Sequence, residues 1–190
     1  MQVRKVGAAV AALTLFCVAP VFAATTGVTV WSTTDRTGNV VSNGSTTATE
    51  RNTVDITRAF IYRNTAGTAY TVRIYVDHLA GLKNWLESIG VNTYYASGRP
   101  ATQLSVDFNT IHLGSRTLYQ WGRGDQFGNH VCYPNFSVNY TQNWVELWGI
   151  GRACMARGTQ YPVAFAFADN LGGSGHVANA ALRRLHSFTN

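Results

Sequence analysis

Apolar and polar residues alternate with a period of two over most of the chain after residue 53. In residues 70–76 the even positions are apolar or aromatic, and Thr, Arg and Tyr residues lie between them. Such alternation is typical of a strand that buries one face. Residues 54–62 alternate similarly, and residues 64–67 have the composition of a turn. We therefore predict an antiparallel hairpin that pairs residues 54–62 with residues 70–76.

The first strand of this hairpin has an irregular pattern. A strict period of two places Val54, Ile56, Phe60 and Tyr62 on one face, which Arg58 interrupts. We therefore expect these four residues to share a face.

Further alternating stretches predict the rest of a sheet. The last of them carries apolar residues on both faces, as a central, covered strand does. Residues 32–53 are polar and rich in Thr, Ser, Asn and Gly, which predicts turns joined by an exposed edge strand. The four further predicted strands lie at residues 104–108, 136–140, 145–147 and 161–168.

Two segments have helical spacing instead. In residues 79–89 leucine and isoleucine recur every three or four residues, and Gly90 fits a C-terminal cap. In residues 176–187 an apolar stripe is preceded by Ser174 as N-cap and followed by basic residues in the last turns. We predict short helices over both ranges.

These elements predict a mainly β fold with seven or eight strands. Two helices are too few to connect parallel strands throughout, so the sheet should be antiparallel. An antiparallel sandwich, or one curled sheet with the helices at its margin, follows; an α+β arrangement is the alternative. No linker or repeat divides residues 24–190, which predicts one domain.

Residues 1–23 have the pattern of a secretory signal peptide. Arg4 and Lys5 precede an uncharged apolar run, and the segment ends in Ala23, where we expect cleavage. The run is shorter than the ~20 residues that a membrane-spanning helix needs. The protein should therefore be secreted or periplasmic. Because an exported chain readily forms disulfides, the two cysteines that remain, Cys132 and Cys154, should form one.

Composition narrows the function. The chain is 46% hydrophobic and only 13% charged, which excludes a disordered protein. Loss of Arg4 and Lys5 lowers the net charge from +6 to +4, and the remaining basic residues are scattered rather than clustered. Nucleic acid is therefore not an expected partner.

No catalytic, cofactor or metal motif is present, so we expect no cofactor and no metal site. A hydrolase would need a general base, a general acid and a cation for an anionic transition state. His130, Glu146 and Arg152 are the candidates, which the disulfide would bring near one another. The alternative is a structural ion pair between Glu146 and Arg152.

The most informative segment for binding is 143–149. In a strand, Val145 and Leu147 face one side, and Trp144, Glu146 and Trp148 face the other. Two indoles with a carboxylate between them suit a sugar, whose C–H surface packs on the rings while its hydroxyls donate to the carboxylate. The alternative is a strand covered on both faces, with Glu146 paired to an arginine. The aromatic residues that could extend the surface are Trp121, Tyr133 and Tyr140.

We therefore expect a secreted, non-enzymatic binding module for a glycan or another cell-surface ligand, such as a lectin-like domain, an adhesin or a toxin's receptor-binding subunit. A small secreted hydrolase or toxin, such as a nuclease, is the alternative. A further alternative is an envelope structural or membrane-acting protein, in which residues 42–57 could form an amphipathic hairpin. Whether the chain forms homo- or hetero-oligomers stays open.

Overall fold

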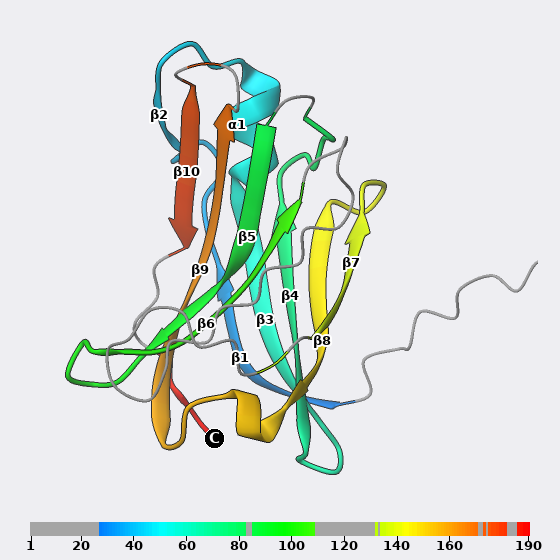
Figure 1. The fold of residues 1–190 in the computed structure, drawn as a ribbon, viewed down its shortest axis with the longest axis vertical. Helices are drawn as coiled ribbons and strands as arrows, with labels where there is room; N and C mark the ends of the chain where they lie inside the picture. The colour runs from blue at the N-terminus through cyan, green and yellow to red at the C-terminus, as the bar shows by residue number, and fades with distance from the viewer. Residues whose placement is uncertain are drawn as a thin grey trace, which may run out of the picture.

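The chain forms a sandwich of two antiparallel sheets (Figure 1). A computed structural model describes residues 27–82, 85–108, 132, 134–170, 173, 175–181 and 186–190. The elements in chain order are β1 (Gly27–Thr34), β2 (Val41–Asn43), α1 (Ala48–Val54), β3 (Ile56–Asn64), β4 (Ala69–Val76), β5 (Trp85–Tyr94), β6 (Pro100–Phe108), β7 (Asn135–Asn139), β8 (Trp144–Gly151), the 3-10 turn η1 (Arg152–Cys154), β9 (Thr159–Asn170), β10 (His176–Ala181) and β11 (Phe188–Thr189).

Strand order defines the two layers. One sheet has the order β1-β3-β4-β8-β7, and the other has the order β2-β10-β9-β5-β6. Strand β11 pairs with the first two residues of β9. Every second residue along the strands of both sheets points inward, and these side chains form one core, as in sandwiches generally. The predicted mainly β, antiparallel sandwich is confirmed, although the described residues form 11 strands rather than the expected seven or eight.

The predicted hairpin is confirmed from Ile56 onward, whereas Val54 is the last residue of helix α1. Strand β3 pairs antiparallel with β4, and the Gly67 N–H donates to the Asn64 carbonyl across the turn (2.9 Å). The predicted face of β3 is wrong, because a bulge between Ile56 and Arg58 shifts the alternation by one residue. Ile56 therefore faces the core, whereas Phe60 and Tyr62 lie half-buried on the opposite side.

Both predicted helices are wrong. Residues 85–89 of the first belong to β5, and residues 176–181 of the second belong to β10. Gly90 is not a helix cap: an added Cβ would lie 2.1 Å from the Leu104 carbonyl oxygen, because β6 approaches closely there. Strand pairing on both sides overrides the helical spacing in each case.

The described helix lies where we expected only turns and an edge strand. The exposed edge strand exists as β2, but α1 follows it. The Thr47 hydroxyl accepts from the Glu50 N–H (3.4 Å), and the Glu50 carboxylate accepts from the Thr47 N–H. This is the capping box, which the Thr-x-x-Glu spacing announces. Helix α1 closes one end of the sandwich beside β10 (Figure 1).

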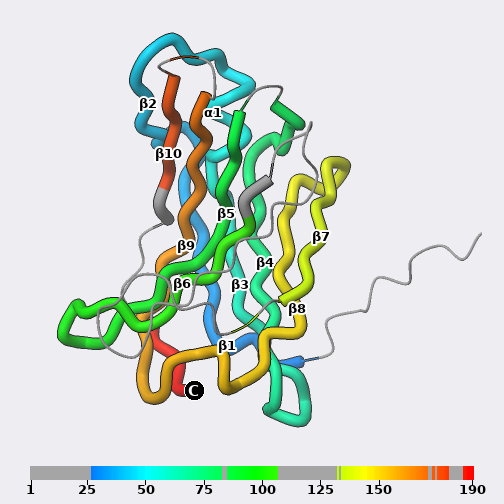
Figure 2. Tube along the Cα trace, viewed as in Figure 1, coloured from blue at the N-terminus to red at the C-terminus, as the bar shows by residue number. Residues whose placement is uncertain are grey.

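A disulfide and the C-terminal residue secure the other end. Cys132 and Cys154 are bonded, with their Cα atoms 5.7 Å apart, as predicted. The C-terminus lies beside η1 and the start of β9 (Figure 2), where the Asn190 side chain donates to the Arg152, Met155 and Ala156 carbonyls. Among the described residues, no helix has the length and apolar character needed to cross a membrane.

Candidate ligand-binding face

The side of the β1-β3-β4-β8-β7 sheet that faces away from the core carries large aromatic and charged side chains. Cross-strand register aligns Phe60 with Arg73 and Arg73 with Glu146 in one row. The next row aligns Arg58 with Tyr75 and Tyr75 with Trp144. We call this surface the outer face; its members are Arg58, Phe60, Tyr62, Arg73, Tyr75, Trp144, Glu146 and Trp148.

Three aromatic rings form a connected group on the outer face. The Phe60 and Tyr62 rings stack with centroids 5.6 Å apart and planes 17° from parallel. The Tyr75 ring meets Phe60 edge to face at 6.1 Å. All three side chains are half-buried, so their outer surfaces remain accessible. Such a group offers apolar area and two phenol hydroxyls to the same ligand.

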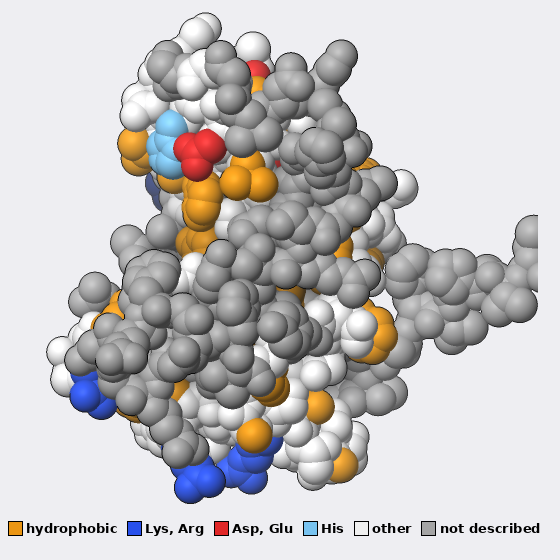
Figure 3. All heavy atoms as spheres, viewed as in Figure 1, with side chains coloured by type: hydrophobic (Ala, Val, Ile, Leu, Met, Phe, Trp, Pro, Cys, Tyr) orange, Lys and Arg blue, Asp and Glu red, His pale blue; other side chains and the backbone are white. Residues whose placement is uncertain are grey.

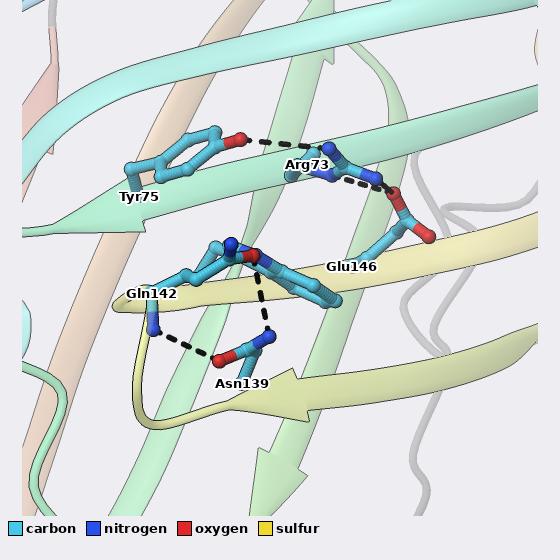
Figure 4. Close-up of polar contacts among 6 residues, drawn as sticks. Arg73, Tyr75, Asn139, Gln142 and Glu146 are labelled. Atoms are coloured by element: carbon cyan, nitrogen blue, oxygen red, sulfur yellow. Dashed lines mark hydrogen bonds and ion pairs between the residues drawn. The ribbon is translucent and has the colours of Figure 1, made fainter. Parts of the chain in front are cut away.

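An arginine–glutamate pair occupies the centre of the face (Figure 4). Arg73 Nε and Nη2 both contact Glu146 Oε2, at 2.6 and 2.5 Å, and Nη1 donates to the Tyr75 hydroxyl at 3.5 Å. Burial lowers the pKa of Arg73, but the Tyr75 hydroxyl and Glu146 outweigh it and raise that pKa. The guanidinium therefore stays charged, and the pair fixes β4 to β8 on this side.

The two indoles that we expected to act as platforms differ in accessibility. Trp144 is only 4% exposed: Arg73 lies 4.9 Å from its ring centroid, and its Nε1 donates to Gln142 Oε1 (2.9 Å). The Gln142 side chain is held in turn by Asn139 (Figure 4). Trp148 is 42% exposed, next to Gly149, whose φ is +73°. Trp144 therefore packs against the Arg73 guanidinium and is covered, whereas Trp148 is the indole that a ligand can reach.

Several groups of the outer face shift the pKa of the Tyr62 hydroxyl. Desolvation raises its pKa, the Arg73 charge opposes this, and Tyr75, Glu146 and Arg58 make smaller contributions. The phenol therefore stays protonated at neutral pH and can donate a hydrogen bond to a ligand.

Of the remaining predicted binding residues, only Tyr140 is described. Trp121 and Tyr133 lie outside the described residues. Tyr140 is 40% exposed in the turn between β7 and β8. Burial raises its pKa, with a contribution from Glu87, which faces the core. Because it lies in the turn that joins β7 to β8, Tyr140 is at the end of these strands rather than on the outer face. Its role in binding stays a prediction.

Of the predicted hydrolase residues, Glu146 and Arg152 are described, and they form no ion pair with each other. His130 lies outside the described residues. Glu146 pairs with Arg73 rather than with Arg152, and the exposed Arg152 donates to Asn190 Oδ1 (3.3 Å). The described structure therefore does not bring Glu146 and Arg152 into one catalytic arrangement.

A separate polar pair lies on the other sheet. His176 Nδ1 and Asp169 Oδ1 are 2.5 Å apart, both side chains are about half exposed, and the imidazole tilts against the Phe167 ring at 6.3 Å. Figure 3 shows a histidine and an acidic side chain together beside hydrophobic atoms. We missed this pair because we placed His176 on a helix. Residue 176 instead lies on β10, whose antiparallel pairing with β9 puts His176 directly opposite Asp169.

Sequence reasoning also missed Arg58, Phe60, Tyr62, Arg73 and Tyr75 as one site. Their association depends on the bulge in β3 and on the pairing of β4 with β8, which are 73 residues apart at the Arg73–Glu146 contact. In the part of the chain that the structure describes, no group of three or more His, Cys, Asp or Glu side chains is arranged to hold a metal ion. No family model matches the sequence, and neither a curated protein nor a solved structure matches it significantly.

Proposed function

We propose that the chain is an exported, non-enzymatic binding module that recognises a glycan through its outer face. One observation carries the proposal: half-buried aromatic rings surround a fixed arginine–glutamate pair on the side of the sheet that does not form the core. Sugar rings pack their C–H faces on aromatic side chains, while their hydroxyls hydrogen-bond to nearby polar groups. The N-terminal sequence pattern and the disulfide support export.

The network also supports binding because it is already ordered. Arg73 is held by Glu146, Tyr75 and Trp144 together, so little side-chain freedom remains to be lost when a ligand docks. Ordering a side chain on binding costs about 0.5–1.5 kcal/mol, and a rigid face avoids much of that cost.

A glycan array probed with the purified chain from residue 24 onward, followed by calorimetric titration of the best ligand, tests the proposal. Tyr62→Ala should weaken binding at least about tenfold, since a ring contact and a hydroxyl are both lost. Tyr94→Ala is the matched control: Tyr94 is also half-buried, but it lies on β5 in the other sheet. Equal loss in both variants, or no glycan binding by the parent protein, would contradict the proposal.

A small hydrolase is the second candidate, favoured by the Asp169–His176 pair. Asp169 contacts Nδ1; in the neutral tautomer that donates from Nδ1, Nε2 can accept a proton, which is the arrangement of a general base. A screen of ester and phosphodiester substrates with the parent protein and His176→Ala distinguishes the candidates. Turnover that the variant loses would favour the hydrolase over the binding module.

A further inference from the structure

The two arginines of the outer face differ in their electrostatic environment. Arg73 is neutralised by Glu146, with two nitrogens on one carboxylate oxygen. Arg58 is exposed, and its only described contact through the guanidinium is the Tyr75 ring, at 3.9 Å from the centroid. No carboxylate among the described residues forms an ion pair with Arg58. The outer face therefore carries one uncompensated positive charge, at the Arg58 end.

The position of Arg58 over Tyr75 prepares the guanidinium for an anion. Cation–π contact uses the face of the guanidinium group and leaves the N–H groups at its edge available to donate hydrogen bonds to an acceptor. These N–H groups can bind a carboxylate or sulfate with two hydrogen bonds at once. Because the Tyr75 ring already restricts the side chain, binding an anion there costs less conformational entropy than at a freely moving arginine.

A hollow lies along β1, and one of its lining residues, Thr34, is paired with Arg58 in the β1–β3 register. Its volume is about 390 Å³, and its walls include most of β1, Phe60, His186 and Ser187. Ser32 is opposite Phe60 and Thr34 is opposite Arg58 in the β1–β3 register, and both side chains are exposed. The hollow thus combines an aromatic wall with hydroxyl groups, and Arg58 is the cross-strand neighbour of its lining residue Thr34. The volume falls within the range of small-ligand sites.

We infer that the ligand of the outer face is an acidic saccharide, whose anionic substituent binds Arg58 while its ring packs against Phe60 at the hollow. Arg58 and Phe60 are two residues apart on β3, so their side chains leave the same side of the strand about 6.6 Å apart and can contact one saccharide. The inference rests on the proposed function and narrows its ligand class. A carboxylate and a sulfate share the required chemistry.

Three ligand arms test the inference. The best carboxylated oligosaccharide on an array is titrated by calorimetry beside the same oligosaccharide with its carboxyl groups reduced to alcohols, and beside a sulfated oligosaccharide. A charge-assisted hydrogen-bond pair is worth about 10- to 100-fold in affinity, so the reduced ligand should bind weaker by that factor. The affinity for the acid should also fall as salt is raised, because Arg58 is exposed. The carboxylated and sulfated arms identify which anion is preferred, and preference for either supports the inference.

Two charge variants locate the effect. Arg58→Gln should remove the difference between the acidic ligand and its reduced form and leave the melting temperature unchanged. Arg157→Gln is the control: it removes the same charge from an exposed arginine on the connection between η1 and β9. It should leave both affinities unchanged.

The failures of the inference and of the proposed function are distinguishable. If the reduced ligand binds as tightly as the acid, or if Arg58→Gln keeps the difference, the acidic-ligand inference is wrong. The proposed function survives that result as long as Tyr62→Ala still loses binding to the neutral sugar. If no saccharide of any class binds, both are wrong.

Discussion

Glu87 is a carboxyl group inside the sandwich core without enough partners to stay charged. It is only 1% exposed and lies on β5 between Phe108 and Ala168 of the neighbouring strands. The Leu82 N–H donates to Oε1 (3.1 Å), but Oε2 has no hydrogen-bond partner among the residues that the structure describes. Desolvation raises the pKa of Glu87 to about 8, and the single hydrogen bond from Leu82 opposes this only in part. At neutral pH the folded protein therefore holds Glu87 mostly protonated.

This protonation makes the stability depend on pH in a defined direction. The unfolded chain has a Glu87 pKa near 4.5, so between pH 4.5 and about 8 the folded state binds a proton that the unfolded state releases. The free energy of unfolding therefore falls as pH rises through this window, by up to about 1.4 kcal/mol per pH unit. The shift corresponds to a contribution of about 3 kcal/mol lost between pH 4.5 and pH 7, and about 4 kcal/mol by pH 8.

Glu87→Gln isolates this contribution because glutamine has the same shape and does not titrate. We expect urea unfolding of the parent protein at pH 5, 6, 7 and 8 to show decreasing stability, and the variant to show a flatter profile. Each N–H of the glutamine amide that lacks an acceptor in the core costs about 1–3 kcal/mol at every pH. The difference in slope, rather than the absolute stability, is therefore the measurement.

All other titrating groups are common to the two proteins, including Asp55, whose pKa burial also raises. Their contributions cancel when the two profiles are subtracted. Parallel profiles for Glu87→Gln and the parent would refute the reasoning, because they would mean that Glu87 has the same pKa folded and unfolded.

Three further predictions concern stability. Reducing the Cys132–Cys154 bond should cost about 3 kcal/mol for a loop of this length, measured as a lower denaturant midpoint; an unchanged midpoint would contradict it. Trp144→Ala should cost about 3–5 kcal/mol and lower the melting temperature by roughly 6–20 °C, whereas the platform hypothesis expects an intact fold. Gly90→Ala should cost about 1–3 kcal/mol or more, since its Cβ would overlap backbone; a neutral effect in a thermal melt would contradict the close approach of β6.

The sequence predicted the parts of the fold that local pattern determines. Strands β3 and β4 alternate clearly and are joined by a four-residue turn, so their pairing needs no long-range information. The core side of β8 was equally visible, because Val145 and Leu147 alternate with larger polar and aromatic residues. A period of two identifies the residues that share a face of a strand, as long as no bulge lies between them.

The helix predicted over residues 79–89 was wrong because its regularly spaced apolar residues are buried for different reasons. Leu79 and Leu82 are buried in the connection that follows β4, whereas Ile89 faces the core from within β5. Their three- and four-residue spacing therefore spans two different structures. Helix propensity differences are at most about 1 kcal/mol per residue for most residues, which pairing on both strand edges readily exceeds.

The candidate site was predictable only at its β8 end. Trp144, Glu146 and Trp148 share a face of one strand, and local alternation shows that. The contact of Glu146 with Arg73 comes from strand order, and the presence of Phe60 on the same side comes from a bulge. Neither strand order nor a bulge leaves a signal in one short segment, so the aromatic group and both arginines were missed.

The outer face is hard to explain by folding alone. The inner positions of the same strands, Ala59, Ile61, Val72 and Ile74, are already fully buried, so the core is complete without the outer side chains. Antiparallel sheets usually place small polar residues on their open side, and partly exposed ion pairs add little to stability. Half-buried phenylalanine and tyrosine rings there leave apolar surface in water, which a ligand would cover. Replacing Phe60 with threonine should therefore change binding far more than stability, because the position is one that the fold does not need for its core.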